Sequence, residues 1–277
     1  MRPLTGPAML GVQKPVTKQR EKEVELPDLE RLRRIRDALY GGGFSLYAQP
    51  IFELSNGRVI RHELLLRMRE NGRVIGAGEF LDLIEAYGPI REVDRWVVRA
   101  AAGLAGNGWR VNVNVSDHSI NGEFPEFVRA RLASEGVLPG GIVFEVREAQ
   151  LVRDQGASRE FAWAVRELGC GLALDDFGRG DHRLTFVRDL PISYLKIDGE
   201  LTGDLLHDRA SCEVVRAIVR LAAEFEQLTV AEKVEDVATL QTLEELGVDQ
   251  AQGFALGTPA PVERIEDMAE PAEPVPG

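Results

Sequence analysis

Short apolar runs alternate with amphipathic stretches along most of this chain, and this alternation limits its fold more than any other feature. Stretches with helical spacing of apolar residues lie at 77–86, 92–104, 158–168, 211–226 and 237–246. Eight runs have the length and composition of strands: 45–52, 59–66, 111–115, 142–146, 171–174, 194–197, 228–231 and 250–255. Such alternation predicts a mostly parallel sheet. About eight strands in 277 residues favour closure into one α/β barrel over an open doubly wound sheet.

The two ends of the chain depart from this pattern. Residues 1–26 are polar and lack periodicity, which predicts a disordered tail. Leu29, Leu32, Ile35 and Leu39 then share one helical face, so a short packing helix should open a barrel domain over 27–261. A dimerising coiled coil is the alternative for this helix. Residues 262–277 are rich in Pro and Glu and predict a second, acidic disordered tail.

Charge and hydropathy restrict the partners. The formal net charge is −12, so we expect no DNA binding, because phosphate contacts require Lys and Arg. A phosphate-ester substrate would need bound cations as a bridge. We expect no membrane span and no secretion signal, and hence a cytoplasmic protein, because no apolar run approaches the roughly 20 residues of a bilayer-spanning helix. Cys170 and Cys212 are expected to be reduced thiols.

Polar residues interrupt the apolar runs about once per strand. They are Glu63, Asn114, Glu145, Asp175, Asp176, Lys196, Glu232 and Gln252, with Glu235 shortly after Glu232. Because the carboxyl ends of parallel barrel strands meet at one rim, these side chains are expected to converge. Clustered carboxylates repel one another unless cations separate them, and oxygen ligands suit Mg²⁺ or Mn²⁺. The pattern therefore predicts a divalent metal site.

Each of these residues taken singly has a simpler interpretation. Asp175 and Asp176 could cap a helix, Asn114 could cap a turn, and Lys196 could be a salt-bridge partner. A single strand-end glutamate is usually solvated. The recurrence on strand after strand favours the metal site.

Seven motifs follow one another in an order known from one family. They are His62-Glu63-Leu64-Leu65-Leu66-Arg67, Asn114-Val115-Ser116, Glu145-Val146-Arg147-Glu148, Asp175-Asp176-Phe177-Gly178, Lys196-Ile197-Asp198, Ala231-Glu232-Lys233-Val234-Glu235 and Gln252-Gly253-Phe254. With them the chain resembles the EAL domain family over residues 44–261. The resemblance implies a modified TIM-type (β/α)8 barrel. It also implies a bacterial cytoplasmic signalling protein that hydrolyses cyclic di-GMP to linear pGpG with Mg²⁺ or Mn²⁺.

The resemblance also implies roles for individual residues. Glu63, Asn114, Glu145 and Asp175 would hold one metal ion, Asp176 would join Asp175 at a second, and Glu232 would complete the metal shell. Two matches would act on the attacking water: Lys196 would orient or deprotonate it, and Gln252 would position it or the metal shell. Gln49 and Arg67 would contact cyclic di-GMP. Glu235 would support the site, and Glu148 would anchor the loop after Asp176.

The chain departs from the family pattern near this site. Leu64 replaces an alanine, and the loop at 179–183 carries Arg179, Asp181, His182 and Arg183 in place of small residues. Arg147 and Lys233 replace a threonine and a glycine. Added cations could weaken metal binding, pair with acids such as Glu148, or bind substrate phosphate. The alternative function is therefore a catalytically weak or inactive sensor that binds cyclic di-GMP or a protein partner. Family members often form homodimers, which the altered loop leaves open here.

Overall fold

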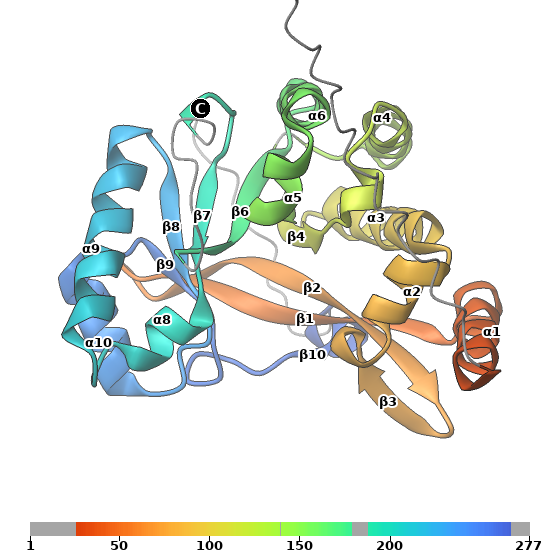
Figure 1. Cartoon of the computed structure of the whole chain (residues 1–277), viewed down its shortest axis with the longest axis horizontal. Helices are drawn as coiled ribbons and strands as arrows, with labels where there is room; N and C mark the ends of the chain where they lie inside the picture. The colour runs from red at the N-terminus through yellow and green to blue at the C-terminus, as the bar shows by residue number, and fades with distance from the viewer. Residues whose placement is uncertain (1–25, 139, 179–187, 267–277) are drawn as a thin grey trace, which may run out of the picture.

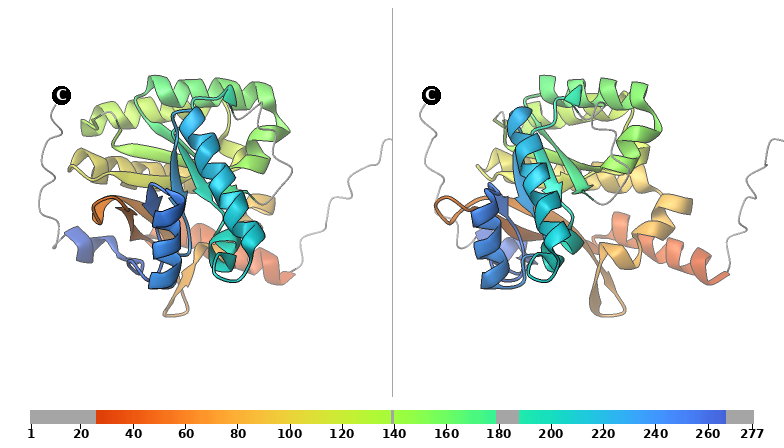
Figure 2. Two further views of the ribbon diagram at one scale, coloured as in Figure 1. Left: turned by 90° about the vertical axis from the view of Figure 1, so that its left-hand side faces the viewer. Right: turned by 60° about the vertical axis from the view of Figure 1, so that its left-hand side comes forward.

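Eight strands pair side by side into a closed barrel. Figures 1 and 2 show helices packed around the outside of these strands. The computed structural model describes residues 26–138, 140–178 and 188–266. The barrel strands, in their order around the barrel, are β1 (Phe44–Glu53), β2 (Arg58–Glu70), β4 (Val111–Asn114), β5 (Ile142–Arg147), β6 (Gly171–Phe177), β7 (Tyr194–Ile197), β8 (Leu228–Ala231) and β9 (Gln250–Ala251). Strand β9 pairs with β1 and completes the ring. The predicted barrel is confirmed.

Strand β1 runs opposite to both of its neighbours, β2 and β9, whereas the other barrel neighbours are parallel. This reversal distinguishes the barrel from an all-parallel TIM barrel. A short strand β10 (Ala260–Pro261) pairs antiparallel with Tyr47 and Ala48 of β1. The carboxyl ends of the seven parallel strands consequently face the same end of the barrel.

The helices lie in sequence between and around these strands. They are α1 (Leu26–Gly41), α2 (Leu81–Tyr87), α3 (Ile90–Gly106), α4 (Glu123–Glu135), α5 (Glu148–Arg153), α6 (Gln155–Glu167), α8 (Gly199–Asp204), α9 (Arg209–Glu224), α10 (Val237–Leu246) and α11 (Val262–Glu266), with 3-10 turns η1 (Ala77–Glu79) and η2 (Asp117–Ser119). Within the described ranges, no helix combines the length and the apolar character that crossing a bilayer demands.

The parallel strands are buried on both faces. Residues Ile142 to Val146 of β5 are all buried, because one face packs into the barrel and the other against helices such as α3. This is why the parallel strands appear in the sequence as continuous apolar runs without alternation. Any buried polar side chain within such a run must therefore find its hydrogen-bond or ion-pair partners inside the barrel.

Strand β2 is longer than the predicted segment 59–66. Its last residues pair with β3 (Arg73–Gly76) in a hairpin that projects beside α1 in Figure 1. The turn residues Asn71 and Gly72 have φ values of 50° and 77°. A two-residue hairpin turn needs two such positive φ angles, and Asn-Gly is its favoured sequence. That signal was present, but β3 was not predicted.

Aspartates begin several helices and so shape the loops near the carboxyl ends of the strands. Asp198, directly after β7, accepts a hydrogen bond from the Glu200 backbone N–H and begins α8. Asp236 accepts bonds from the Thr239 backbone N–H and hydroxyl and begins α10. These bonds satisfy otherwise unpaired N–H groups at the helix start.

The structure shifts both predicted domain boundaries. Helix α1 already begins at Leu26, and helix α11 follows Pro261, with Val262 buried against β1. The prediction of disorder from 262 is therefore wrong for 262–266, where an apolar residue finds a packing surface. The rest of the two predicted tails, residues 1–25 and 267–277, lies outside the described residues.

Candidate active site

Lys196 of β7 lies at the centre of the polar cluster inside the barrel. Its ammonium Nζ is 2.6 Å from Glu232 Oε1, 2.7 Å from Glu145 Oε2, 3.2 Å from Asp175 Oδ1 and 3.5 Å from Glu63 Oε2. Only 1% of the lysine side chain is exposed. Four strands that are far apart in sequence thus contribute carboxylates to one ammonium group. The predicted convergence of these side chains is what the geometry displays.

The carboxylate of Glu63 is held by two side-chain amides, one from β4 and one from the end of β9. Asn114 Nδ2 donates to Glu63 Oε1 at 2.8 Å, and Gln252 Nε2 donates to Glu63 Oε2 at 2.9 Å. Gln252 also donates to Gln49 Oε1 at 3.1 Å, and Gln49 in turn donates to the Gly257 carbonyl. Glu63 is therefore oriented from both of its oxygens.

Gly253 allows this arrangement of Gln252. A β-carbon at position 253 would collide with the backbone of Val234, in the loop that follows Glu232. The two segments are tied together by the Val234 N–H, which donates to the Gln252 carbonyl at 3.0 Å. A side chain larger than hydrogen at 253 would therefore separate Gln252 from Glu232.

Asn112 belongs to the cluster although it was not among the predicted site residues. Its Nδ2 donates to Glu145 Oε1 at 2.8 Å, and both side chains are buried. Asn112 and Asn114 alternate with valines on β4, so both lie on the strand face that points into the barrel. That period-2 pattern was the available signal for Asn112.

Asp175, Asp176 and Glu232 can present oxygens that all lie within 4.8 Å of one another. Asp175 Oδ1 is buried and lies 3.2 Å from the Lys196 ammonium, its ion-pair partner. Asp176 adopts the left-handed conformation, with φ of 56°, which few residues other than glycine, asparagine and aspartate accept. The two adjacent aspartates can thereby serve the same site.

Burial and mutual repulsion raise carboxyl pKa values in this cluster. Desolvation by burial raises the pKa of Glu232 to about 7, with Asp175 and Glu63 adding to the effect. Burial and the nearby Glu63 raise the pKa of Glu145 well above its usual value. Burial, and then Asp175 and Asp198, raise the pKa of Asp176. Each of these groups would be more readily ionised with a cation beside it.

For Lys196, burial and the neighbouring charges act on the pKa in opposite directions. Burial alone would lower its pKa, but the four surrounding carboxylates together raise the pKa of Lys196 well above its usual value. The side chain therefore remains an ammonium ion.

The donor set fits divalent cations. Five carboxylates (Glu63, Glu145, Asp175, Asp176 and Glu232) surround one ammonium, so the fully ionised cluster is strongly negative. A carboxylate oxygen has two lone pairs, and the Lys196 ammonium engages at most one on Asp175 Oδ1, so another is available to a cation. Hard oxygen ligands of this kind bind divalent metal ions, and the cluster can hold one.

A cavity of about 300 Å³ opens onto this cluster. Asn114, Glu145 and Asp175 line it at one side, and Arg67 of β2 and residues of α2 and α3 form other parts of its wall. The Arg67 guanidinium lies 5.3 Å above the ring of Tyr47, which holds it in place. Gln49 lies within the cluster's hydrogen-bond network instead, since it contacts Gln252.

Asp94 of α3 also lines this cavity and was not predicted as a site residue. Its Oδ2 accepts hydrogen bonds from the hydroxyls of Ser116 and Ser119, at 2.5 Å and 2.7 Å, and from the Ser116 N–H. Burial raises the pKa of Asp94. Its place among Ile90, Val93, Val97 and Val98 on the apolar face of α3 was the sequence signal. A buried acid on such a face needs a reason.

Two further predicted residues follow the carboxyl ends of β8 and β5. Glu235 is exposed, and among the described residues it makes no hydrogen bond or ion pair. Glu148 is half-buried at the start of α5. The loop that Glu148 is predicted to anchor, including Arg179, Asp181, His182 and Arg183, lies outside the described residues.

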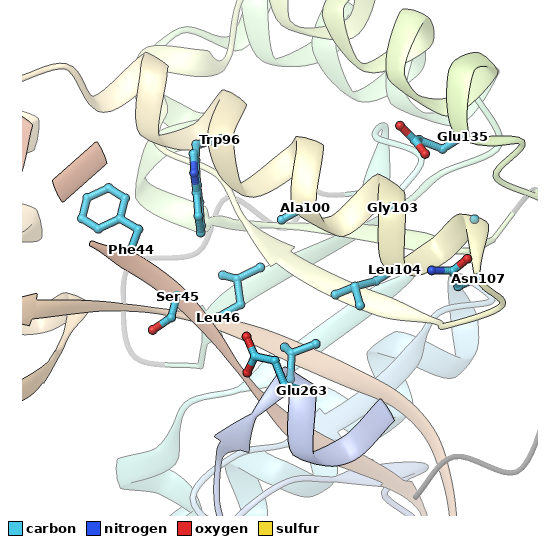
Figure 3. A pocket seen from close by; sticks show the side chains of 12 residues that line it. Phe44, Ser45, Leu46, Trp96, Ala100, Gly103, Leu104, Asn107, Glu135 and Glu263 are labelled. Carbon is cyan, nitrogen blue, oxygen red and sulfur yellow. The ribbon is translucent and has the colours of Figure 1, made fainter. Parts of the chain in front are cut away.

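A second pocket, of about 460 Å³, lies between β1, α3 and α11 (Figure 3). Phe44, Leu46, Trp96 and Leu104 give it an apolar wall, with Glu135 and Glu263 at its border. None of the residues of the Lys196 cluster lines it. This pocket is therefore separate from the site inside the barrel.

Known proteins share this architecture and sequence. The bifunctional diguanylate cyclase/cyclic di-GMP phosphodiesterase MucR of Pseudomonas aeruginosa is 34% identical over 247 residues, which cover 86% of this chain and 36% of MucR. The cyclic di-GMP phosphodiesterase PA2567 of the same organism is 34% identical over 234 residues, 81% of this chain and 40% of that protein. The chain thus spans well under half the length of these relatives.

Solved structures agree with this relationship. The MucR phosphodiesterase in its c-di-GMP complex superimposes with a TM-score of 0.81 at 33% identity, over 85% of this chain and 99% of that one. The FimX EAL domain of Xanthomonas citri, also in complex with c-di-GMP, gives a TM-score of 0.79 at 27% identity, over 86% and 98% of the two chains. The EAL domain sequence model matches residues 32–259, and this protein therefore belongs to the EAL domain family.

Proposed function

We propose that this chain hydrolyses cyclic di-GMP to linear pGpG with the help of Mg²⁺ or Mn²⁺. The observation that carries the proposal is the cluster of five carboxylates and Lys196 beside a cavity of about 300 Å³. Relatives at 34% identity bear the name cyclic di-GMP phosphodiesterase, and a similar structure contains c-di-GMP. The activity of the longer relatives is carried over to this chain as part of the proposal.

The carboxylates would hold the metal ions. Glu63, Asn114, Glu145 and Asp175 are assigned to one ion, and Asp175, Asp176 and Glu232 to a second. When bound, a pair of divalent ions activates water and neutralises charge on both the attacking and the leaving oxygen of an in-line displacement. Mg²⁺ and Mn²⁺ suit such small oxygen sites better than Ca²⁺, which prefers more ligands at longer distances.

Lys196 would orient the attacking water as a hydrogen-bond donor. Because the carboxylates keep its pKa high, it is poorly suited to remove a proton, which favours orientation over the alternative of deprotonation. In the reaction the water oxygen forms a bond to phosphorus and the bond from phosphorus to the ribose oxygen breaks. The attacking water gives up one proton and the leaving oxygen takes one up, so the protons balance. Gln252, which donates a hydrogen bond to Glu63, would keep that carboxylate oriented toward the attacking water.

The cavity would receive a guanine base. Its apolar wall, formed by residues such as Leu66, Val93 and Val97, suits the faces of a purine. Asp94 offers a carboxylate acceptor, and guanine carries the N1–H and amino donors that such an acceptor pairs with. Arg67 would bind a substrate phosphate from the same wall.

A sensor that binds cyclic di-GMP without turnover is the second candidate. The ion pairs of Lys196 with Glu145 and Glu232 favour it, because an ammonium already satisfies two carboxylates assigned to metal. In that case the cluster would be a structural ion-pair network beside a nucleotide pocket.

Turnover with a matched metal-site variant separates the two candidates. Purified protein is incubated with cyclic di-GMP and Mg²⁺ or Mn²⁺, and linear pGpG is measured by chromatography, with Glu63→Ala in parallel. The enzyme requires product from the wild type, its loss in Glu63→Ala, and inhibition by Ca²⁺. Tight binding of cyclic di-GMP with no product at any metal concentration would leave the sensor instead.

A further inference from the structure

Arg147 stands in the wall of the cavity that opens onto the carboxylate cluster. It is the last residue of β5, and in the parallel pairing with β6 it is level with Asp175. Among the described residues that line this cavity, Arg67 and Arg147 are the cationic ones. Arg147 therefore lies next to a proposed metal ligand and shares a cavity with the proposed phosphate-binding arginine.

The Arg147 guanidinium is loosely held. Its side chain is 51% exposed, and its Nη2 lies 3.5 Å from Glu85 Oε1 of α2, a long distance for a charged pair. Fully made guanidinium–carboxylate bonds are shorter, about 2.7–2.9 Å, and often two are made in parallel. A guanidinium carries five N–H donors, and among the described residues this long contact is the one ion pair that Arg147 makes, which leaves donors for a ligand.

The excess of acidic side chains in the cavity wall is the reason to assign Arg147 a role in phosphate binding. The wall also contains Glu85, Asp94, Glu145 and Asp175, so acids outnumber the two arginines. A cyclic dinucleotide would bring two anionic phosphates into this environment, and metal ions held by the cluster would neutralise the one beside them. The other phosphate requires a cation from the cavity wall, and planar guanidinium groups are well shaped for phosphate.

We propose that Arg147 is a second phosphate-binding residue for the cyclic dinucleotide, in addition to Arg67, and that Glu85 competes with the phosphate for it. The inference rests on the proposed function and adds a residue that the resemblance did not assign. Substrate binding would exchange the weak Arg147–Glu85 contact for a charge-assisted bond to phosphate.

Steady-state kinetics with cyclic di-GMP test this assignment. Arg147→Thr should raise KM about tenfold with kcat changed less than about threefold, as expected for loss of one charged hydrogen bond made equally to substrate and transition state. Arg147→Lys keeps the charge but loses the planar, two-pronged guanidinium, so its KM should lie between the KM values of Arg147→Thr and the wild type. Glu85→Gln should lower KM, and the double variant should match Arg147→Thr, because Glu85 acts only through Arg147.

Arg129→Thr is the matched control. Arg129 is also 51% exposed and also pairs with a glutamate, Glu126, but it lies on α4 away from the cavity. It should leave KM unchanged. The dependence of log(kcat/KM) on log salt should become shallower in Arg147→Thr and not in Arg129→Thr, since a phosphate contact contributes to that slope.

The outcomes separate this inference from the function on which it rests. Wild-type protein that neither binds nor hydrolyses cyclic di-GMP would end the proposed function and the inference together. Turnover with equal KM and equal salt dependence in Arg147→Thr and Arg129→Thr would overturn the inference alone. A lowered kcat at unchanged KM would also overturn it, because that result describes a role in the chemical step rather than in phosphate binding.

Discussion

The ammonium of Lys196 lies 2.7 Å from the carboxylate of Glu145, and both side chains are fully buried in the barrel. Because each partner is costly to bury alone, this pair links the stability of the barrel to its proposed chemistry. Three further carboxylates share the same ammonium. Removal of the lysine should therefore affect both the stability of the barrel and the proposed catalytic activity.

Lys196→Met should abolish turnover and destabilise the metal-free protein. Loss of the ammonium leaves the buried carboxylates without a counter-charge, which costs about 3–5 kcal/mol in the free energy of unfolding. Saturating Mg²⁺ should recover much of this stability, because divalent ions replace the missing charge. Urea unfolding with and without Mg²⁺ measures both values. Lys233→Met, a change of an exposed neighbouring lysine, should have little effect on the free energy of unfolding, and equal Mg²⁺ stabilisation in all three proteins would contradict the prediction.

Metal affinity should rise with pH through the neutral range. The pKa of Glu232 in the metal-free protein is about 7, so below that value the group carries a proton that a cation must displace. Protonation of Glu232 should lower the affinity about tenfold for each pH unit below 7. Calorimetric titration with Mn²⁺ at several pH values measures this slope. Glu232→Gln removes the titrating group and should flatten the profile, so an unchanged slope in that variant would assign the proton elsewhere.

Asp94→Asn should weaken substrate binding more than catalysis. The change keeps the shape of the side chain but removes the charged acceptor that faces the cavity, so KM for cyclic di-GMP should rise about tenfold with a small change in kcat. Asp249→Asn is a matched control, because Asp249 likewise accepts bonds from a backbone N–H and a hydroxyl, those of Thr229. It lies outside the cavity and should leave KM unchanged. An equal KM in both variants would remove Asp94 from the binding site.

Gly253→Ala should destabilise the barrel and reduce activity together. The added β-carbon meets the Val234 backbone, which must move, and overpacking of this kind costs about 1–3 kcal/mol. The shift would carry Gln252 away from Glu63. Thermal unfolding and turnover are measured together with Gly203→Ala in α8, where a β-carbon meets open space and stability should hold or increase. Wild-type stability in Gly253→Ala would show that the two segments separate without cost.

The local pattern of apolar runs was sufficient for the barrel strands, because a buried parallel strand needs a continuous apolar segment wherever it lies in the chain. The predicted ranges 194–197 and 228–231 coincide with β7 and β8. Helix α4 was not predicted, since its weakly amphipathic sequence gives little periodic signal, and β9 is shorter than predicted because the chain turns away at Gln252. The sequence also predicted a cluster of polar side chains, because burying a polar residue in an apolar strand costs free energy unless it meets a partner.

Only the tertiary structure decided which polar groups meet and how. Lys196 and Glu145 are 51 residues apart and Gln252 and Glu63 are 189 apart, so their contacts depend on barrel closure. The reversed direction of β1 places Gln49 beside Gln252, and the path of α3 brings Asp94 to the cavity. Such contacts follow from the packing of whole elements, and residue type or local spacing does not contain that information.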